Sequence, residues 1–273
     1  MSKEVIAVDL GGTNLRAAHI KNGKIVDYVR KPTSMKKEEL LKDMFELISG
    51  FMGKGVKGIG IACPGPLKDG VIKNPPNIPL KNYDLKGVIK KKFKVRVEVE
   101  NDASCVALAE YKLGVKKKNF FVLTLGTGVG GGIIIDGKLY NREGLGGELG
   151  SIYLTQEKTL QDLVGARAIG EITKEAFGSE MNVGDLVKMK DSKSKKIVEE
   201  IANYLGQGIG SLINIFDPEV VVLAGGMRHS GPEFLEMIRE KTKKYILLEK
   251  KFDIVWSKLE HAGCLGAGLL LER

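Results

Sequence analysis

The stretch of sequence that decides the fold is residues 5–20, which read VIAVDLGGTNLRAAHI. Two apolar runs, Val5–Leu10 and Leu15–Ile20, flank a turn at 11–14 (GGTN), which predicts two strands joined by a tight hairpin. Glycines let backbone N–H groups approach phosphate oxygens closely, and Thr13 adds a hydroxyl donor. A phosphate-binding loop is one interpretation of this turn, and a plain β-turn is the other.

Asp9 is the penultimate residue of the first of these runs, two residues before Gly11. Hydrated Mg²⁺ keeps several waters beside carboxylates and phosphates, so Asp9 is a candidate to hold Mg²⁺ through water.

The remainder of the first hundred residues continues as alternating strands and helices. Asn22-Gly23 is a strong hairpin turn, and apolar residues recur at helical spacing after residue 36. Further strands are expected at Lys24–Arg30, Gly58–Cys63 and Val95–Glu100, and helices at Lys36–Met52 and Ala103–Leu113.

The second half repeats this order, which predicts two similar lobes joined near 114–119. We expect the two lobes to comprise 1–115 and 116–273, the final helix (about 261–273) being placed to pack back on the first. Strands are expected at Phe120–Leu125, Gly132–Ile135, Gly137–Tyr140, Val220–Ala224 and Phe252–Ser257, and helices at about 160–177, 183–190, 193–216, Pro232–Leu247 and Gly263–Leu271.

Glycine fills most of 126–132 (GTGVGGG), more than a hairpin needs, since each glycine costs conformational entropy. The run lacks the Gly-Lys-Ser/Thr of a P-loop and is followed by a strand, where a dinucleotide fingerprint would open a helix. A hairpin that clamps phosphate is therefore favoured over flexible structure. The buried strand 220–224 ends in Gly225-Gly226, which would let an adenine ring lie against backbone; a plain strand-to-helix turn is the alternative.

Asn101-Asp102 stands between a predicted strand and a predicted helix. Both residue types cap helices well, which is the structural interpretation. The catalytic interpretation makes Asp102 the base that accepts the proton of an attacking hydroxyl, because phosphoryl transfer needs one aligned carboxylate and charge neutralisation.

The composition is that of a globular protein, with 43% hydrophobic and 28% charged residues among 273. No apolar run reaches the roughly 18 residues that span a bilayer, and no signal-peptide pattern opens the chain, so a cytoplasmic protein is expected. The net charge of +9 suits polyanions. However, the lysine clusters at 90–92 and 116–118 lack interleaved aromatic residues, which indicates a solvated face.

Taken in order, these motifs resemble the actin-like sugar-kinase superfamily, and specifically the ROK family of sugar kinases and repressors. The resemblance runs from Ile6 to 263–268 (GCLGAG). It adds 60–66 (GIACPGP), a sugar-side loop in the family's pattern, and 144–150 (GLGGELG), which resembles the family signature.

The resemblance implies an α/β chain with a two-lobed actin-like (ribonuclease H-like) ATPase fold, a duplicated mixed sheet flanked by helices, and ATP and sugar meeting in the cleft. The lobe 1–115 would be the sugar side and carry Asp102 as the catalytic base, and the lobe 116–273 would be the nucleotide side. The implied sugar-binding residues are Gly65, Asn77, Asn101, Asp102, Glu148, Ser151 and Gln161. The implied ATP-binding residues are Asp9, Gly11, Gly12, Thr13, Asn14, Gly126, Thr127, Gly128, Gly225 and Gly226.

Three departures from the family pattern concern the sugar. Ser151 stands where the family has a histidine that touches sugar and often zinc, and Gln161 stands where a second sugar-binding glutamate is expected. The cysteine cluster of the family's zinc site is absent, since Cys63, Cys105 and Cys264 are far apart, so no zinc site is expected.

The leading interpretation is ATP- and Mg²⁺-dependent phosphorylation of a hexose hydroxyl, glucose to glucose 6-phosphate. Another sugar, an aminosugar or a cyclic polyol such as inositol is the alternative within the class. A ROK-type repressor or sugar sensor is the alternative of another class; repressors carry a helix-turn-helix domain first, and a strand starting at about Val5 leaves no room for one. Expected partners are a small sugar or polyol, without nucleic acid or membrane, in a homodimer or homotetramer.

Overall fold

The computed structural model describes residues 4–75, 77–141, 144, 146–247 and 252–272. The chain divides into two compact units. Unit 1 comprises Met1–Lys116, Leu139–Gly146 and Leu259–Arg273; unit 2 comprises Lys117–Lys138 and Gly147–Lys258. Within the motifs singled out above, Pro76 and Leu145 lie outside the described residues. The assignment of sugar to one lobe and nucleotide to the other stays a prediction.

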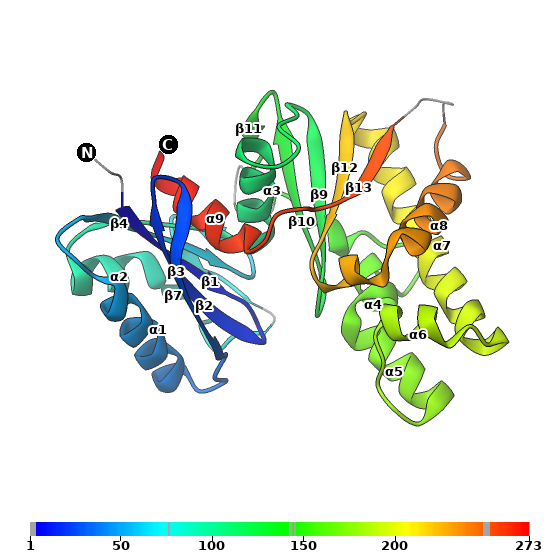
Figure 1. Cartoon of the computed structure of the whole chain (residues 1–273), viewed down its shortest axis with the longest axis horizontal. Coiled ribbons are helices and arrows are strands. Elements are labelled where there is room, and N and C mark those ends of the chain that lie inside the picture. Colours follow the sequence, from blue (N-terminus) through cyan, green and yellow to red (C-terminus); the bar gives the residue numbers. More distant parts are fainter. Residues whose placement is uncertain (1–3, 76, 142–143, 145, 248–251, 273) are drawn as a thin grey trace. The chain divides into compact units, whose positions relative to one another are not determined.

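Unit 1 is built on a five-stranded mixed sheet in the order β3-β2-β1-β4-β8 (Figure 1). The first three strands are antiparallel neighbours, and β1, β4 and β8 run parallel. The strands are β1 (Glu4–Leu10), β2 (Asn14–Lys21), β3 (Lys24–Pro32), β4 (Val56–Cys63) and β8 (Arg96–Asn101). A small second sheet is formed by β5 (Leu67–Lys68), β6 (Val71–Ile72) and β7 (Tyr83–Asp84).

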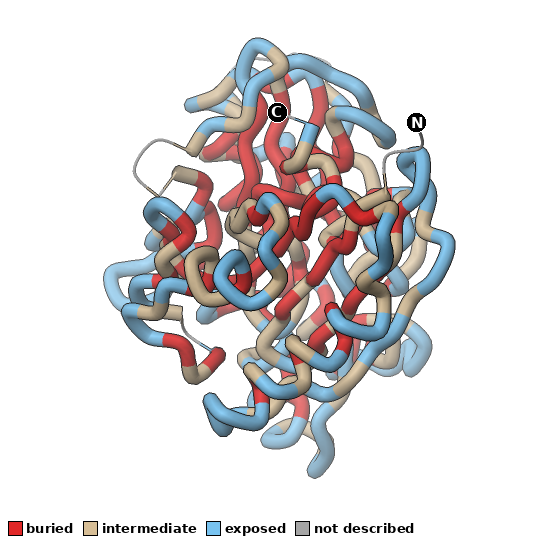
Figure 2. Tube along the Cα trace, turned by 90° about the vertical axis from the view of Figure 1, so that its left-hand side faces the viewer, coloured by how far each residue is buried: buried red, intermediate tan, exposed pale blue. Residues whose placement is uncertain are grey.

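Side chains alternate across this sheet, as strand geometry requires. Ile6 and Val8 of β1 join one buried cluster with α1 (Lys37–Phe51) and α2 (Leu85–Phe93). Ala7, on the opposite face, joins a second cluster with α3 (Asp102–Lys112) and α9 (Ala262–Leu269), which the short helix η3 (Leu270–Glu272) follows. Figure 2 shows buried stretches in the interior of the chain and exposed ones at the periphery.

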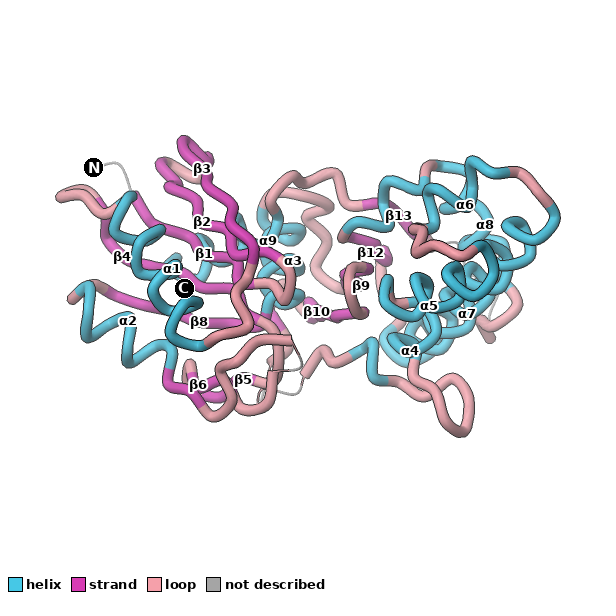
Figure 3. The backbone as a smooth tube through the Cα atoms, turned by 90° about the horizontal axis from the view of Figure 1, so that it is seen from below, coloured by secondary structure: helices cyan, strands magenta, loops and turns pink. Residues whose placement is uncertain are grey.

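Unit 2 repeats the same plan, with a sheet in the order β11-β10-β9-β12-β13. Its helices gather beside β9 and β12 (Figure 3), and Phe121, Leu123 and Leu125 of β9 lie in their shared core. The strands are β9 (Phe120–Leu125), β10 (Val129–Ile135), β11 (Lys138–Leu139), β12 (Val220–Ala224) and β13 (Asp253–Trp256). The helices are η1 (Leu149–Ser151), α4 (Leu160–Val164), α5 (Ala166–Phe177), α6 (Val183–Met189), α7 (Ser192–Phe216), η2 (Gly226–Ser230) and α8 (Pro232–Lys243).

The predicted duplication of a mixed sheet flanked by helices is confirmed. The small sheet and α2 were not predicted, and β10 begins at Val129, three residues earlier than expected. The helix expected over 160–177 is divided into α4 and α5, because Gly165 adopts an extended backbone (φ −64°, ψ 149°). Among the described residues, no helix is long and apolar enough to cross a membrane.

Candidate active site

The carboxyl ends of the parallel strands in unit 1 gather the predicted residues at one edge of its sheet. Asp9 lies near the end of β1, and Gly65 and Asp102 directly follow β4 and β8. Open α/β sheets bind ligands at this edge, because the loops after the strands project there.

The turn at 11–14 is held in place by its neighbours. Gly11 N donates to Asn14 O at 2.9 Å, and Thr33 donates from its backbone N–H to Thr13 O at 3.0 Å and from its hydroxyl to Gly11 O at 2.7 Å. The loop is therefore ordered without a ligand, which lowers the entropy cost of binding an anion there.

A segment around residue 77 packs on this turn. A Cβ at Gly12 would lie 2.7 Å from Asn77 Cβ, and one at Gly65, where φ is +91°, would lie 2.7 Å from Pro75 Cα. Residues with side chains would push the segment away at both places. The structure thus brings Gly12, Gly65 and Asn77 together, although they are far apart in sequence.

Asp9 is largely buried and already has a cationic partner. The register of β1 and β2 sets Arg16 directly opposite, and Arg16 Nη1 lies 2.8 Å from Asp9 Oδ2. A Cβ at Gly263, near the start of α9, would lie 2.8 Å from the same oxygen. Burial raises the pKa of the Asp9 carboxyl, and the Arg16 charge opposes that rise. With one oxygen occupied, this carboxylate suits Mg²⁺ contact through water rather than direct ligation.

The two interpretations of Asn101-Asp102 separate in the structure. Asn101 is the N-cap of α3, and its Oδ1 accepts from Ser104 N at 3.0 Å. Asp102 occupies the first turn, where its Oδ1 accepts from Ala103 N at 2.8 Å. Capping is thus the work of Asn101, and the helix N-terminus stabilises the negative charge of Asp102.

Glu100 is a residue of this edge that sequence reasoning missed. Its Oε1 accepts from Asn101 N at 2.9 Å and from Asn141 Nδ2, and Asn141 in turn accepts from Gly144 N at 3.1 Å. This chain of hydrogen bonds fastens the start of the 144–150 motif to unit 1. Glu100 and Asn141 are 41 residues apart in sequence, so a local sequence pattern cannot predict their contact.

In unit 2, the same edge of the sheet carries the second glycine-rich hairpin and a pocket. Gly225 has φ +91°, and a Cβ there would overlap Leu125 O, so only glycine suits the close approach of β12 to β9. Gly126 and Gly226 line a pocket of about 450 Å³, a volume that suits a nucleoside.

The other walls of this pocket were not predicted. They come from the end of β9, the first half of α5, the segment that leads into α6 and helix η2: Leu125, Ala166, Ile169, Gly170, Glu180, Met181, Asn182, Val183, Met227, His229 and Ser230. Ala166, Ile169 and Gly170 have the spacing of any core-facing helix stripe, so periodicity could not mark them as pocket residues. His229 was close to the predicted nucleotide loop but was assigned no role.

The remaining predicted sugar ligands divide into two groups. Glu148 directly precedes η1, Ser151 is its last residue, and both are exposed at the surface. Partial desolvation nevertheless raises the pKa of the Glu148 carboxyl. Gln161, by contrast, turns its side chain to the glycine-rich hairpin, where Oε1 accepts from Val129 N at 3.1 Å.

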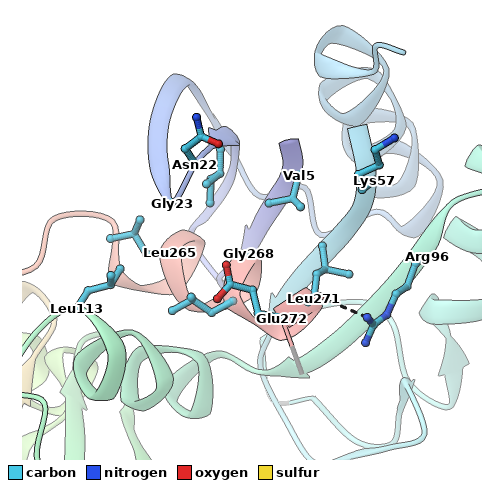
Figure 4. Close-up of a pocket in the computed structure, with 12 residues that line it drawn as sticks. Val5, Asn22, Gly23, Lys57, Arg96, Leu113, Leu265, Gly268, Leu271 and Glu272 are labelled. Atoms are coloured by element: carbon cyan, nitrogen blue, oxygen red, sulfur yellow. Dashed lines mark hydrogen bonds between the residues drawn. The ribbon is translucent and has the colours of Figure 1, made fainter. Parts of the chain in front are cut away.

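A second hollow, of about 490 Å³, lies in unit 1 (Figure 4). Val5, Lys57 and Arg96 line it from the amino ends of β1, β4 and β8, the opposite edge of the sheet from Asp9 and Asp102. None of the predicted site residues lines it, so it is not the candidate active site.

The solved structures that share this fold include ROK family sugar kinases. The chain belongs to the ROK family, whose sequence pattern matches residues 5–273.

Named relatives include both enzymes and regulators. The chain is 28% identical to a glucokinase of Thermotoga maritima, over 98% of this chain and 97% of that one. It is also 28% identical to a xylose repressor of Caldicellulosiruptor bescii, over 86% of this chain and 69% of the repressor.

Two crystal structures match nearly the whole chain. One is a ROK hexokinase from Thermus thermophilus (31% identity, TM-score 0.85, 98% of each chain). The other is a ROK family glucokinase from Streptomyces griseus in complex with glucose and AMPPNP (25% identity, TM-score 0.88, 98% of each chain).

Proposed function

We propose that the protein transfers the γ-phosphoryl group of ATP to a hydroxyl of a hexose, with glucose the leading substrate. The observation that carries the proposal is that Asn101 and Asp102 have different positions at the start of α3. Asn101 is the N-cap of the helix, and the adjacent carboxylate of Asp102 lies in the first turn, which supports its proposed role as the base. The glucokinase relative and the structure solved with glucose and AMPPNP support the same class of reaction.

In the proposed reaction, the attacking hydroxyl gives its proton to Asp102 while its oxygen bonds to the γ-phosphorus. The bond from that phosphorus to the bridging oxygen breaks, and ADP leaves. Asn77, Asn101, Glu148 and Ser151 would orient the sugar. The turns at 11–14 and 126–128 offer backbone N–H groups to the phosphates. Mg²⁺, held near Asp9 through water, would neutralise charge on the phosphates.

The test is ADP release measured across a panel of sugars with wild-type protein and Asp102→Asn. The amide cannot accept the proton, so kcat should fall by about 10²–10⁴, while the free energy of unfolding stays within about 1 kcal/mol. Asp84→Asn is the matched control: Asp84 caps α2 through Gly87 N at 2.8 Å, away from the site. Near-wild-type turnover by Asp102→Asn would remove Asp102 from the mechanism.

The acceptor panel addresses substrate choice. Ser151 and Gln161 are neutral where the family pattern supplies stronger partners, and charge-assisted hydrogen bonds are about twice as strong as neutral ones. We expect modest discrimination among glucose, mannose, fructose, glucosamine and N-acetylglucosamine, or a preference for a polyol such as inositol. A preference for glucose of about 10⁴ or more in kcat/KM over all the others would contradict this reading of the two positions.

A further inference from the structure

The side chain of Gln161 contacts the glycine-rich hairpin of unit 2, at Val129. We propose that Gln161 is a positioning residue for the hairpin at 126–129, which makes it a determinant of nucleotide affinity rather than a ligand of the sugar. The inference rests on the proposed kinase function, because it assigns the hairpin to the donor phosphates.

The first argument is the hydrogen bond itself. Val129 is only 5% exposed, and its N–H donates to Gln161 Oε1 at 3.1 Å. A buried N–H that loses its acceptor has little access to water, so the hairpin would have to rearrange to satisfy it. Thr159 and Asp162 form a capping box that fixes the first turn of α4 and thereby the backbone of Gln161.

The second argument is that Gln161 belongs to a larger support. Ala166 N donates to Gly126 O at 2.9 Å, Arg167 N to Thr127 O at 3.4 Å, and Gly126 N to Gly128 O at 3.0 Å. The carbonyls of 126 and 127 are therefore directed to the start of α5, where they cannot repel phosphate oxygens. Such fixed orientation of backbone dipoles is what lets a loop stabilise charge without reorganising.

The third argument concerns Gly128. A Cβ at this position would overlap Gln161 Oε1, so the glycine and the glutamine fit one another. On its other side, Val129 presents its carbonyl to Gly150, where a Cβ would also overlap. Two residues farther along β10, a Cβ at Gly131 would overlap Gly147 O, so the 147–151 turn, which carries Glu148, also packs on the strand beyond the Gln161 bond. Loss of the Gln161 bond should consequently loosen the hairpin at 126–129, which is assigned to the ATP phosphates. It should leave the 147–151 turn, which is assigned to the sugar, in place.

The experiment compares three variants by calorimetric binding of AMPPNP and of the best sugar from the panel. Gln161→Met keeps the length of the side chain without a carbonyl, Gln161→Glu keeps an acceptor, and Gln207→Met is the matched control. Gln207 also bonds backbone within unit 2, from Nε2 to Leu154 O at 3.2 Å, but away from the hairpin.

We expect Gln161→Met to weaken AMPPNP binding about tenfold and to change sugar affinity by less than about twofold. Gln161→Glu should stay within about threefold of wild type for AMPPNP, because the bond to Val129 N is retained, and Gln207→Met should change neither affinity. Weaker sugar binding with unchanged AMPPNP binding in Gln161→Met would overturn the proposal and restore Gln161 as a sugar ligand.

Amide hydrogen exchange tests the positioning role without any catalytic assay. Exchange in 126–132 should rise in Gln161→Met but not in Gln207→Met; equal protection in both would also overturn the proposal. If wild-type protein phosphorylates no sugar in the panel, the proposed function fails, while exchange and AMPPNP affinity still decide the role of Gln161.

Discussion

At the scale of one residue, burial of the ionised Asp9 carboxylate, a candidate magnesium ligand, lowers the stability of the folded protein. Its side chain is only 14% exposed, and the Arg16 guanidinium pairs with it. Burial nevertheless raises the pKa of the carboxyl above its ordinary value. A carboxyl whose pKa is higher in the folded than in the unfolded protein stabilises the fold when protonated, and this contribution is lost as pH rises through the folded pKa.

Asp9→Asn should therefore unfold at the same temperature as wild type, or a higher one, at pH 7, while losing activity. The advantage should shrink as pH falls through the raised pKa of folded Asp9 and should be gone below the ordinary aspartate pKa, where wild-type Asp9 is neutral in both states. Thermal unfolding between pH 3 and 8 measures this. Asp43→Asn is the control, since Asp43 pairs with Lys31 at 2.8 Å but is 28% exposed. A clear loss of stability in Asp9→Asn at pH 7 would show that the Arg16 pair outweighs desolvation.

Glu148 leads to a prediction about pH and activity. Burial raises the pKa of its carboxyl, and a protonated carboxyl is a weaker acceptor for a sugar hydroxyl. The acid limb of kcat/KM for the sugar should thus lie above the ordinary glutamate range. Glu148→Gln, which does not titrate, should show a lower kcat/KM and lose that limb. A pH profile from 4.5 to 8 on both proteins decides it; an unchanged acid limb would assign the limb to another group.

At the scale of elements, alternation and helical spacing predicted most strands and long helices of both units. The exceptions are elements with little pattern to show. Helix α2 buries only Leu85 and Ile89 and is otherwise rich in lysine, so its period is faint. The strands of the small sheet have two residues each and are formed by tertiary pairing alone.

The candidate site likewise contains some features that the sequence predicts and others that it cannot predict. Glycine-rich turns and the Asn101-Asp102 pair are local signals, and the sequence shows them. Glu100 with Asn141 and Gln161 with Val129 are partners across 41 and 32 residues, and a one-dimensional pattern contains no trace of such contacts. Gln161 was accordingly expected to face the sugar on the strength of its position in a motif.

The close packing of α9 against its neighbours predicts the effect of a substitution on stability. A Cβ at Gly266 would overlap Cys105 O of α3, and one at Gly60 of β4 would overlap Ala267 O, so the helix lies backbone to backbone with its neighbours. Gly266→Ala should lower the free energy of unfolding by about 1–3 kcal/mol through overpacking. Gly50→Ala in α1 is the control: nothing lies within 4 Å of its added methyl, and a gain of up to about 1 kcal/mol is expected. Urea unfolding measures both, and equal stability of the two variants would contradict the close packing.

At the scale of the whole molecule, the metal requirement can be predicted. Among the described residues, no group of three or more His, Cys, Asp or Glu side chains is placed to hold a metal ion. Buried Cys63, Cys105 and Cys264 all have thiol pKa values raised by desolvation, which disfavours the thiolate that zinc binds. Activity should therefore vanish in excess EDTA, return with Mg²⁺, and survive a zinc-selective chelator. Stoichiometric zinc by elemental analysis would contradict this.

The way the chain passes between its units also has a consequence for the order of events during synthesis. Residues 259–273 complete unit 1, yet the ribosome makes them only after all of unit 2. Until α9 arrives, Ala7, Ala18 and Ala62 have no helix from that segment to cover them. At about 5–20 residues per second, the wait is roughly 7–28 s. During that interval this face of the nascent amino-terminal sheet has α3 on it but lacks α9, so part of its apolar surface is exposed to a chaperone at the exit tunnel.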